Sequence, residues 1–157
     1  MENIKKLRIK RLEDTIEKLK TLKSSEFDYS SFVSKYEGDC GTVCCVAGWY
    51  PKWFPELGLK WIIENNVLYL TKSGVYDISC DLMEWHKISS NEIKFLFFGD
   101  TYNYTIDGIE FYIRNSSNNN LEGVIKIFEE FINLLKEGKI VINLKNINYE
   151  RRRYKSF

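Results

Sequence analysis

Several features that would point to a particular class of protein are scarce in this sequence of 157 residues. It holds one histidine, two prolines and four cysteines, and its apolar runs are far shorter than the ~20 residues that cross a bilayer. The N-terminus also lacks the apolar core of a signal peptide. Four clustered cysteines are too few for the disulfide framework of a small secreted domain. We therefore expect a cytoplasmic protein with reduced thiols.

An excess of charge of one sign is also missing. The net charge is +1, which gives no global attraction to nucleic acid or to an anionic membrane, so neither is an expected partner. The length and the 44% share of hydrophobic residues suit one domain over residues 1–157. The chain therefore holds enough apolar material for an ordinary core without disulfide or metal support.

Apolar residues at three- and four-residue steps predict two long amphipathic helices. The first covers residues 2–23, and its inward positions are Ile4, Leu7, Leu12, Ile16, Leu19 and Leu22. Its exposed face is expected to carry Lys5, Lys6, Arg8, Lys10 and Arg11. The second covers residues 121–136 and ends just before Gly138, a residue that suits a helix C-terminus.

Shorter elements lie between these helices. Residues 61–70 predict a hairpin that turns on Asn65-Asn66, and residues 102–113 predict another that turns on Asp107-Gly108. A short helix is expected over residues 81–86, and a capping box of Ser89 and Glu92 begins the next. The predicted fold is α+β: one compact domain in which long N- and C-terminal amphipathic helices pack with short helices and two antiparallel β-hairpins.

The segment Cys40-Gly41-Thr42-Val43-Cys44-Cys45-Val46-Ala47-Gly48-Trp49 combines thiols with a helix start. Thr42 is a good N-cap, so we expect a helix from Val43 that ends near Trp49, because Pro51 disfavours helical geometry at the preceding residue. We favour a structural interpretation of the signature residues. Cys45 and Trp49 would share one face and Gly48 would allow a close approach, while the remaining signature residues are Cys40, Gly41 and Thr42.

A chemical interpretation of the same segment stays open as an alternative. Cys40 would be the nucleophile of a thiol hydrolase or transferase and His86, the one histidine, its base, with Asp28, Asp39 or Asp81 orienting the imidazole. The backbone amides of Thr42 and Val43 would stabilise an oxyanion. Metal binding by Cys40, Cys44, Cys45, Cys80 and His86 is not favoured, because adjacent cysteines on a helix point about 100° apart. Redox pairing of Cys40 with Cys45 would need an oxidising trigger.

The surplus of aromatic residues suggests a recognition face beside the core. The candidates for exposed partner contacts are Tyr29, Trp53, Phe54, Tyr102 and Tyr112. Core packing is the more common role for Trp53 and Phe54, which lie between two prolines.

The residues Cys40-Gly41-Thr42, Cys45 and Gly48-Trp49 form a CGTxxCxxGW pattern. With it the chain resembles a family of small uncharacterised proteins of bacteria and their phages. The stretch Ile88-Ser89, Glu92 and Leu96-Phe97 is similar to the LSxxExxxLF stretch of that family. The resemblance covers much of the chain, although Cys44 and the hairpin over residues 102–113 depart from the pattern. The family carries no agreed function.

The resemblance and the lack of a complete catalytic, nucleotide-binding or metal-binding constellation lead to one expectation. We expect a non-enzymatic phage or mobile-element accessory protein that binds a host protein, a phage protein or a small ligand, in host takeover or counter-defence. It would act in the host cytoplasm without metal or cofactor. The thiol enzyme, a virion structural component and a homodimer formed through an aromatic face remain as alternatives.

Overall fold

The computed structural model describes residues 2–27, 45–64, 67–71, 78–98, 102–106, 109–113 and 120–140. The α-helices within these ranges are α1 (Glu2–Lys20), α2 (Val46–Trp53), α3 (Ile78–His86), α4 (Ser90–Phe98) and α5 (Leu121–Lys136). Two short 3-10 turns, η1 (Ser24–Glu26) and η2 (Pro55–Leu57), flank α2 in the chain. The strands are β1 (Lys60–Glu64), β2 (Val67–Thr71), β3 (Tyr102–Ile106) and β4 (Ile109–Ile113).

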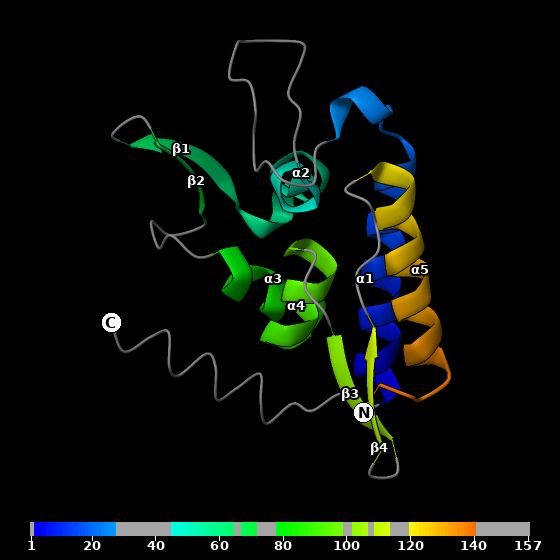
Figure 1. Cartoon of the computed structure of the whole chain (residues 1–157). Coiled ribbons are helices and arrows are strands. Elements are labelled where there is room, and N and C mark those ends of the chain that lie inside the picture. Colours follow the sequence, from blue (N-terminus) through cyan, green and yellow to red (C-terminus); the bar gives the residue numbers. More distant parts are fainter. Residues whose placement is uncertain are drawn as a thin grey trace.

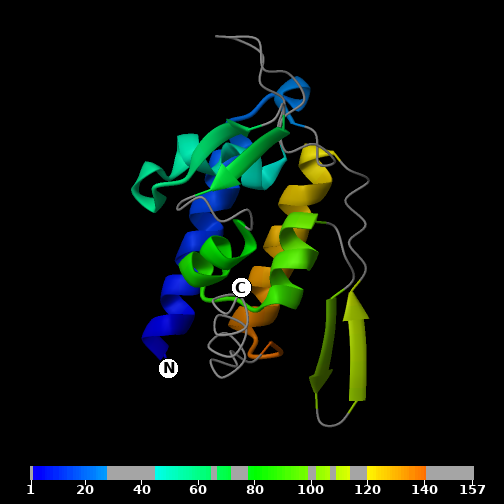
Figure 2. The ribbon, with the colours of Figure 1, turned by 90° about the vertical axis from the view of Figure 1, so that its left-hand side faces the viewer.

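Helices α1 and α5 run antiparallel and side by side, and α2, α3 and α4 pack against one side of this pair (Figures 1 and 2). The first and the last described helix of the chain thus contact each other along one long interface. None of the helices in the described ranges is both long and apolar enough to span a membrane. The core residues that fill the space between the two layers include Leu12, Leu82, Leu96, Phe97 and Phe128.

The predicted α+β class is wrong, because the packed body is made of helices. Where side chains are described, the core residues come from helices and the turns that join them. The strands form two separate two-stranded ribbons at the edge of this body instead of a sheet layer that helices cover (Figures 1 and 2). A two-stranded ribbon offers too little apolar surface to form a layer of the core, whereas α1 and α5 each bury a long stripe of side chains.

The ribbons themselves pair in the predicted register. Trp61 lies opposite Leu70 in the β1–β2 ribbon, and Tyr104 lies opposite Phe111 in the β3–β4 ribbon. The turn positions Asn65-Asn66 and Asp107-Gly108 lie outside the described residues. The turn residues and the alternation of apolar residues therefore predicted the strand pairs correctly, but the fold class inferred from them was wrong.

The face of α1 differs from the prediction in one important residue. Leu12, Ile16 and Leu19 are buried as expected, but Leu7 is 37% exposed and Arg8, assigned to the solvated face, is 1% exposed. At 100° per residue, Arg8 lies one helical turn before Leu12 and inside the buried stripe, whereas Leu7 lies outside it. The charge of Arg8, and not its position in the helical period, led to its assignment to the solvated face.

Helix α2 also begins and ends later than predicted. It starts at Val46 with Cys45 as its N-cap, whereas the predicted start at Val43 and cap at Thr42 lie in residues that the structure does not describe. It continues past Pro51 to Trp53, and the amide of Phe54 donates to the carbonyl of Tyr50 at 2.8 Å. Tyr50 stays helical before a proline because its buried ring is fixed by contacts with other helices.

The turns around α4 and α5 follow known helix-end chemistry. Helix α5 begins at the N-cap Asn120, whose side chain accepts from the amide of Gly123, and ends with Gly138 in a left-handed conformation at φ +73°. Between α3 and α4, Lys87 adopts φ +55°, and the amide of Ile88 donates to the carbonyl of Met83. This tight turn fixes the direction in which α4 leaves α3.

Candidate functional site

The sequence-predicted site residues fall into three groups, of which Tyr102 and Tyr112 on the β3–β4 ribbon form the last. Tyr29, Cys40, Gly41 and Thr42 lie outside the described residues, as do Asp28, Asp39, Val43 and Cys44. His86, Cys45, Gly48, Trp49, Trp53 and Phe54 are described with their side chains. The geometry of the second group decides what chemistry the helical body can support.

His86 lies inside the core, at the C-terminal end of α3. Its side chain is fully buried, and its Nε2 atom lies 2.7 Å from the hydroxyl oxygen of Tyr50 on α2. The Tyr50 hydroxyl also lies 2.8 Å from Oγ1 of Thr15 on α1. A continuous polar chain therefore crosses three helices through the apolar interior, and each member comes from a different helix.

The direction of this hydrogen-bond chain follows from counting protons. The Thr15 hydroxyl donates to the carbonyl of Arg11 at 2.9 Å, so it accepts the bond from Tyr50. The Tyr50 hydroxyl therefore uses its one proton on Thr15 and accepts from His86. His86 is thus the tautomer that carries hydrogen on Nε2. Its Nδ1 is a bare acceptor, and it has no hydrogen-bond partner among the described residues.

Burial and neighbouring cations keep this imidazole neutral. Desolvation, followed by the charges of Arg11 and Arg8, lowers the pKa of His86 from 6.5 to about 3. Burial also raises the pKa of Tyr50 far above its ordinary value of 10.0, so the phenol keeps its proton. At neutral pH the Thr15–Tyr50–His86 chain is an uncharged structural connection.

This environment does not suit a general base for Cys40. A general base has to reach the proton that it removes, directly or through one water, and needs a pKa near the working pH. The His86 imidazole is fully buried, its Nε2 is engaged by Tyr50, and its pKa is far below neutrality. The imidazole is therefore placed to join helices.

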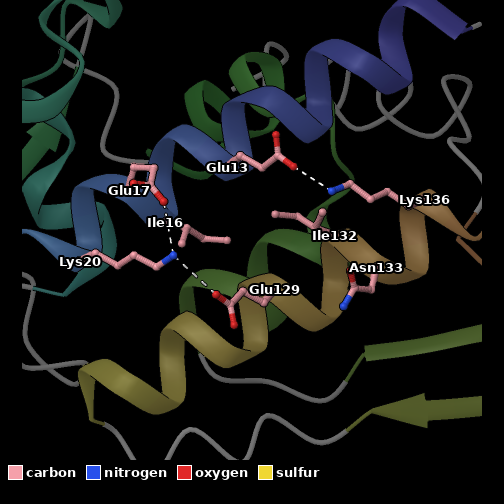
Figure 3. A pocket seen from close by; sticks show the side chains of 8 residues that line it. All are labelled: Glu13, Ile16, Glu17, Lys20, Glu129, Ile132, Asn133 and Lys136. Carbon is pink, nitrogen blue, oxygen red and sulfur yellow. Dashed lines mark hydrogen bonds and ion pairs between the residues drawn. The ribbon is translucent and has the colours of Figure 1, made fainter.

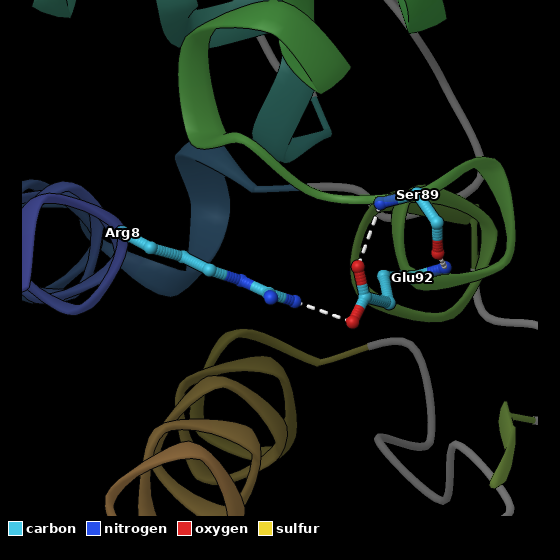
Figure 4. A network of polar contacts seen from close by, with 3 residues as sticks. All are labelled: Arg8, Ser89 and Glu92. Carbon is cyan, nitrogen blue, oxygen red and sulfur yellow. Dashed lines mark hydrogen bonds and ion pairs between the residues drawn. The ribbon is translucent and has the colours of Figure 1, made fainter. Parts of the chain in front are cut away.

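A second buried polar group joins α1 to α4 through charge. The guanidinium of Arg8 crosses the core and pairs with Oε1 of Glu92 (Figure 4). The other carboxylate oxygen, Oε2, accepts the backbone amide of Ser89 at 2.6 Å, and the Ser89 hydroxyl accepts the amide of Glu92 at 3.4 Å. The predicted capping box is confirmed. Glu92 has two roles, because it begins α4 and neutralises a buried cation.

Two arginines of α1, Arg8 and Arg11, each lie over an aromatic ring. The Arg8 guanidinium lies 5.4 Å from the ring centre of Phe131, and the Arg11 guanidinium lies 3.9 Å from that of Trp85. Arg11 also donates to the carbonyl of Trp85, in the last turn of α3, where a cation opposes the negative end of the helix. These contacts of Arg8 and Arg11 were missed from the sequence, since both were assigned to a solvated face.

The described signature residues lie at the start of α2. Cys45, Gly48 and Trp49 are all buried. The Trp49 indole donates to the carbonyl of Glu26 at 3.3 Å and thereby ties α2 to η1. Their positions are those of scaffold residues, consistent with the structural interpretation of this half of the signature.

The predicted aromatic contact residues occupy different environments. Phe54 is buried against Tyr50, with ring centres 5.0 Å apart. Trp53 is half-buried, and its ring stacks on Trp49 at 5.9 Å with an interplanar angle of 14°. In the β3–β4 ribbon, Tyr102 pairs with Ile113 and Tyr112 pairs with Asn103, so the two tyrosines are not paired with each other.

A hollow of about 410 Å³ opens between α1 and α5 (Figure 3). The buried side chains of Ile16 and Ile132 contribute apolar atoms to it, and the remaining lining residues are Glu13, Glu17, Lys20, Glu129, Asn133 and Lys136. We call this set the α1–α5 groove. Its lysines are engaged by carboxylates: Lys136 lies 2.9 Å from Glu13, and Lys20 lies 3.3 Å from Glu17. A ligand here would compete with existing ion pairs.

Two other site classes find little support in the described part of the chain. No group of three or more histidine, cysteine or carboxylate side chains comes together there in a way that could hold a metal ion. The α3–turn–α4 unit has the connectivity of a helix-turn-helix. However, among the α4 side chains described, only Asn91 and Lys94 are exposed. Two exposed side chains give α4 little surface with which to contact a DNA groove.

Comparison with other proteins does not add a relative: no family model matches the chain, and neither a curated protein nor a solved structure shows significant similarity to it.

Proposed function

We propose that this protein acts by binding, as a non-enzymatic phage or mobile-element accessory protein whose partner is a host or phage protein. The observation that carries the proposal is the complete burial of His86 in the Thr15–Tyr50–His86 chain. The one imidazole that could activate a thiol holds three helices together instead. A protein whose buried polar groups stabilise its scaffold is free to vary its surface for recognition.

We place the partner-contacting surface at the exposed side of α2 and η2. Its members are Trp53 and its exposed or half-buried neighbours in the chain, Pro51, Lys52, Pro55 and Glu56, and we call this set the Trp53 surface. The Trp53 ring is ordered by stacking on Trp49, so little rotamer freedom remains to be lost on binding. A half-buried tryptophan beside charged residues is a common kind of interface hot spot.

The resemblance to bacterial and phage proteins supports the accessory role. In its second stretch, Ser89 and Glu92 form the capping box, and Leu96 and Phe97 are buried. In its first, Cys45 and Trp49 are buried. The described residues of these two stretches thus account for the scaffold, and on this proposal the identity of the partner depends on surface residues such as Lys52 and Glu56. Action in the host cytoplasm is part of the same proposal.

Replacement of Trp53 tests this proposal. Affinity capture from bacterial cells would compare the wild type, Trp53→Ala and the control Leu7→Ala, which removes another exposed apolar side chain at a distance from α2. We expect one captured protein to be lost with Trp53→Ala and kept with Leu7→Ala. In a purified pair, the dissociation constant should rise by about tenfold or more with Trp53→Ala. Equal affinity for both variants would contradict the assigned surface.

Thiol reactivity separates binding from the enzyme alternative. An activated Cys40 would react with iodoacetamide well below the ordinary thiol pKa of about 8.5, and His86→Gln would abolish that reactivity. We expect neither result, because the imidazole is buried and engaged by Tyr50. Fast, His86-dependent alkylation would overturn the non-enzymatic proposal.

A further inference from the structure

The tautomer of His86 has a consequence for how the protein responds to acid. Nε2 already donates to Tyr50, so an added proton has to enter at Nδ1. Nδ1 is buried and lacks a hydrogen-bond partner among the described residues. Protonation would therefore create an unpaired donor and a buried positive charge in one step.

The groups that face His86 add to this penalty. Helix α1 contributes the cations Arg8 and Arg11, both of which disfavour a positive imidazole. The carboxylate of Glu92 on α4 is paired with Arg8, and Glu56 on η2 acts on Arg11. From α2 the facing group is the neutral phenol of Tyr50. On α3 itself, Asp81 is half-buried and Glu84 is exposed.

We propose that His86 is an acid-sensitive latch, a single titrating side chain whose protonation releases α2 from α1 and α3 while the α1–α5 pair stays closed. The junction includes the hydrogen bonds that Tyr50 donates to Thr15 and accepts from His86. Apolar contacts join all these helices in one core, and the α1–α5 pair has in addition the Lys136–Glu13 ion pair, in which His86 takes no part. This inference does not depend on which surface binds a partner.

The pH window follows from the two states of the imidazole. In the unfolded or released state the pKa is near 6.5, and in the closed state it is lowered to about 3. A lowered pKa in the closed state means that the open state binds more protons at acid pH. The contribution of the latch to stability is therefore complete above pH 6.5 and falls as the pH drops from 6.5 toward 3.

The first test reads the tautomer directly. The chain has one histidine, so a ¹⁵N–¹H long-range correlation spectrum of the wild-type protein contains one imidazole. At neutral pH we expect the protonated nitrogen to be Nε2 and Nδ1 to be bare. No native-state titration should be seen near pH 6.5. A proton on Nδ1, or a native-state pKa near 6.5, would overturn the proposal.

The second test measures stability and needs one matched variant. In His86→Gln the side-chain amide can still donate toward Tyr50 but does not titrate. For the wild type, the unfolding equilibrium constant should rise by about thirtyfold between pH 7.5 and pH 5, which is close to tenfold per pH unit below 6.5. The rise should be absent in His86→Gln. An equal rise in both proteins would assign the acid response to carboxylates and refute the latch.

The third test locates the opening and uses the wild type alone, so it does not depend on how the variant folds. Amide exchange, expressed as protection factors, would be followed in α2 and α5 from pH 7.5 to pH 5. At each pH we expect lower protection factors for residues 46–53 of α2 than for α5, because α2 also exchanges through the local release, and we expect the α2 factors to fall by about thirtyfold with acid. Equal protection factors in both helices at every pH would mean that α2 opens only by global unfolding and would contradict the local release that we propose.

Discussion

Helix α1 makes ion pairs on two of its faces, and the faces differ in whether water reaches them. Toward α4, Arg8 and Glu92 have side-chain exposures of 1% and 5%. Toward α5, Lys136 and Glu13 form a similar pair with exposures of 53% and 48%. A buried pair has lost its hydration and depends on its partner, whereas an exposed pair exchanges easily with water. Burial, more than residue type, therefore sets how much such an ion pair contributes to the stability of the fold.

The largest effect is expected from breaking the buried pair on one side only. Arg8→Ala should lower the free energy of unfolding by ~3–5 kcal/mol, because the Glu92 carboxylate stays buried without its cation. The contact with Phe131 is lost as well. Urea unfolding at neutral pH measures the change.

A double variant sharpens this prediction. Arg8→Met with Glu92→Gln removes both charges, keeps an amide oxygen that can cap Ser89, and should recover much of the lost stability. A loss below about 1 kcal/mol for Arg8→Ala would contradict the comparison, since it would place the buried pair among ordinary exposed ones.

An intermediate effect is expected for the neutral polar chain. Thr15→Val removes the acceptor of the Tyr50 hydroxyl and leaves a buried donor without a partner. The free energy of unfolding should fall by ~1–3 kcal/mol. The matched control is Thr21→Val, since Thr21 makes the same kind of bond, to the carbonyl of Lys18, on an exposed surface. The control should change stability by less than about 0.5 kcal/mol. Similar losses for both threonines would remove burial as the explanation.

The smallest effect belongs to the α1–α5 groove. A double-mutant cycle on Glu13→Gln and Lys136→Gln should give a coupling of ~0.2–1 kcal/mol. This coupling should vanish in about 1 M salt, where the Debye length is near 3 Å. The Arg8 effect should persist in the same buffer. If salt reduced the Glu13–Lys136 coupling and the Arg8 effect equally, the ion pairs on the two faces of α1 would not differ in their exposure to water.

The elements that could be predicted are those whose signals are local. Helix α5 was expected over residues 121–136 and spans Leu121–Lys136, because a wide apolar stripe, an asparagine cap and a glycine end coincide there. The capping box of Ser89 and Glu92 and both strand registers were also predicted. Each depends on residues within a few positions of one another, so the sequence alone contains the necessary contacts.

The candidate site was predictable only in part. His86 was identified as the one histidine, but the pattern of α3 did not show that its ring would be bonded to Tyr50, 36 positions away. Arg8 was assigned to solvent because charged residues are rarely fully buried, and its partner Glu92 lies 84 positions away. The α+β class failed for the same kind of reason. A correct prediction of the two strand pairs does not show which elements pack on one another.

The sequence by itself determined where α5 begins and ends, where α4 is capped, and which strand residues pair, since these are decided by backbone hydrogen bonds and side-chain periods of short range. The tertiary structure alone decided that Arg8 finds its partner on α4, that His86 is bonded to Tyr50, and that Tyr50 stays helical before Pro51. The physical reason is desolvation. A charge or a hydroxyl enters the core only where a distant group compensates its lost hydration, and that group is known only once the helices are packed.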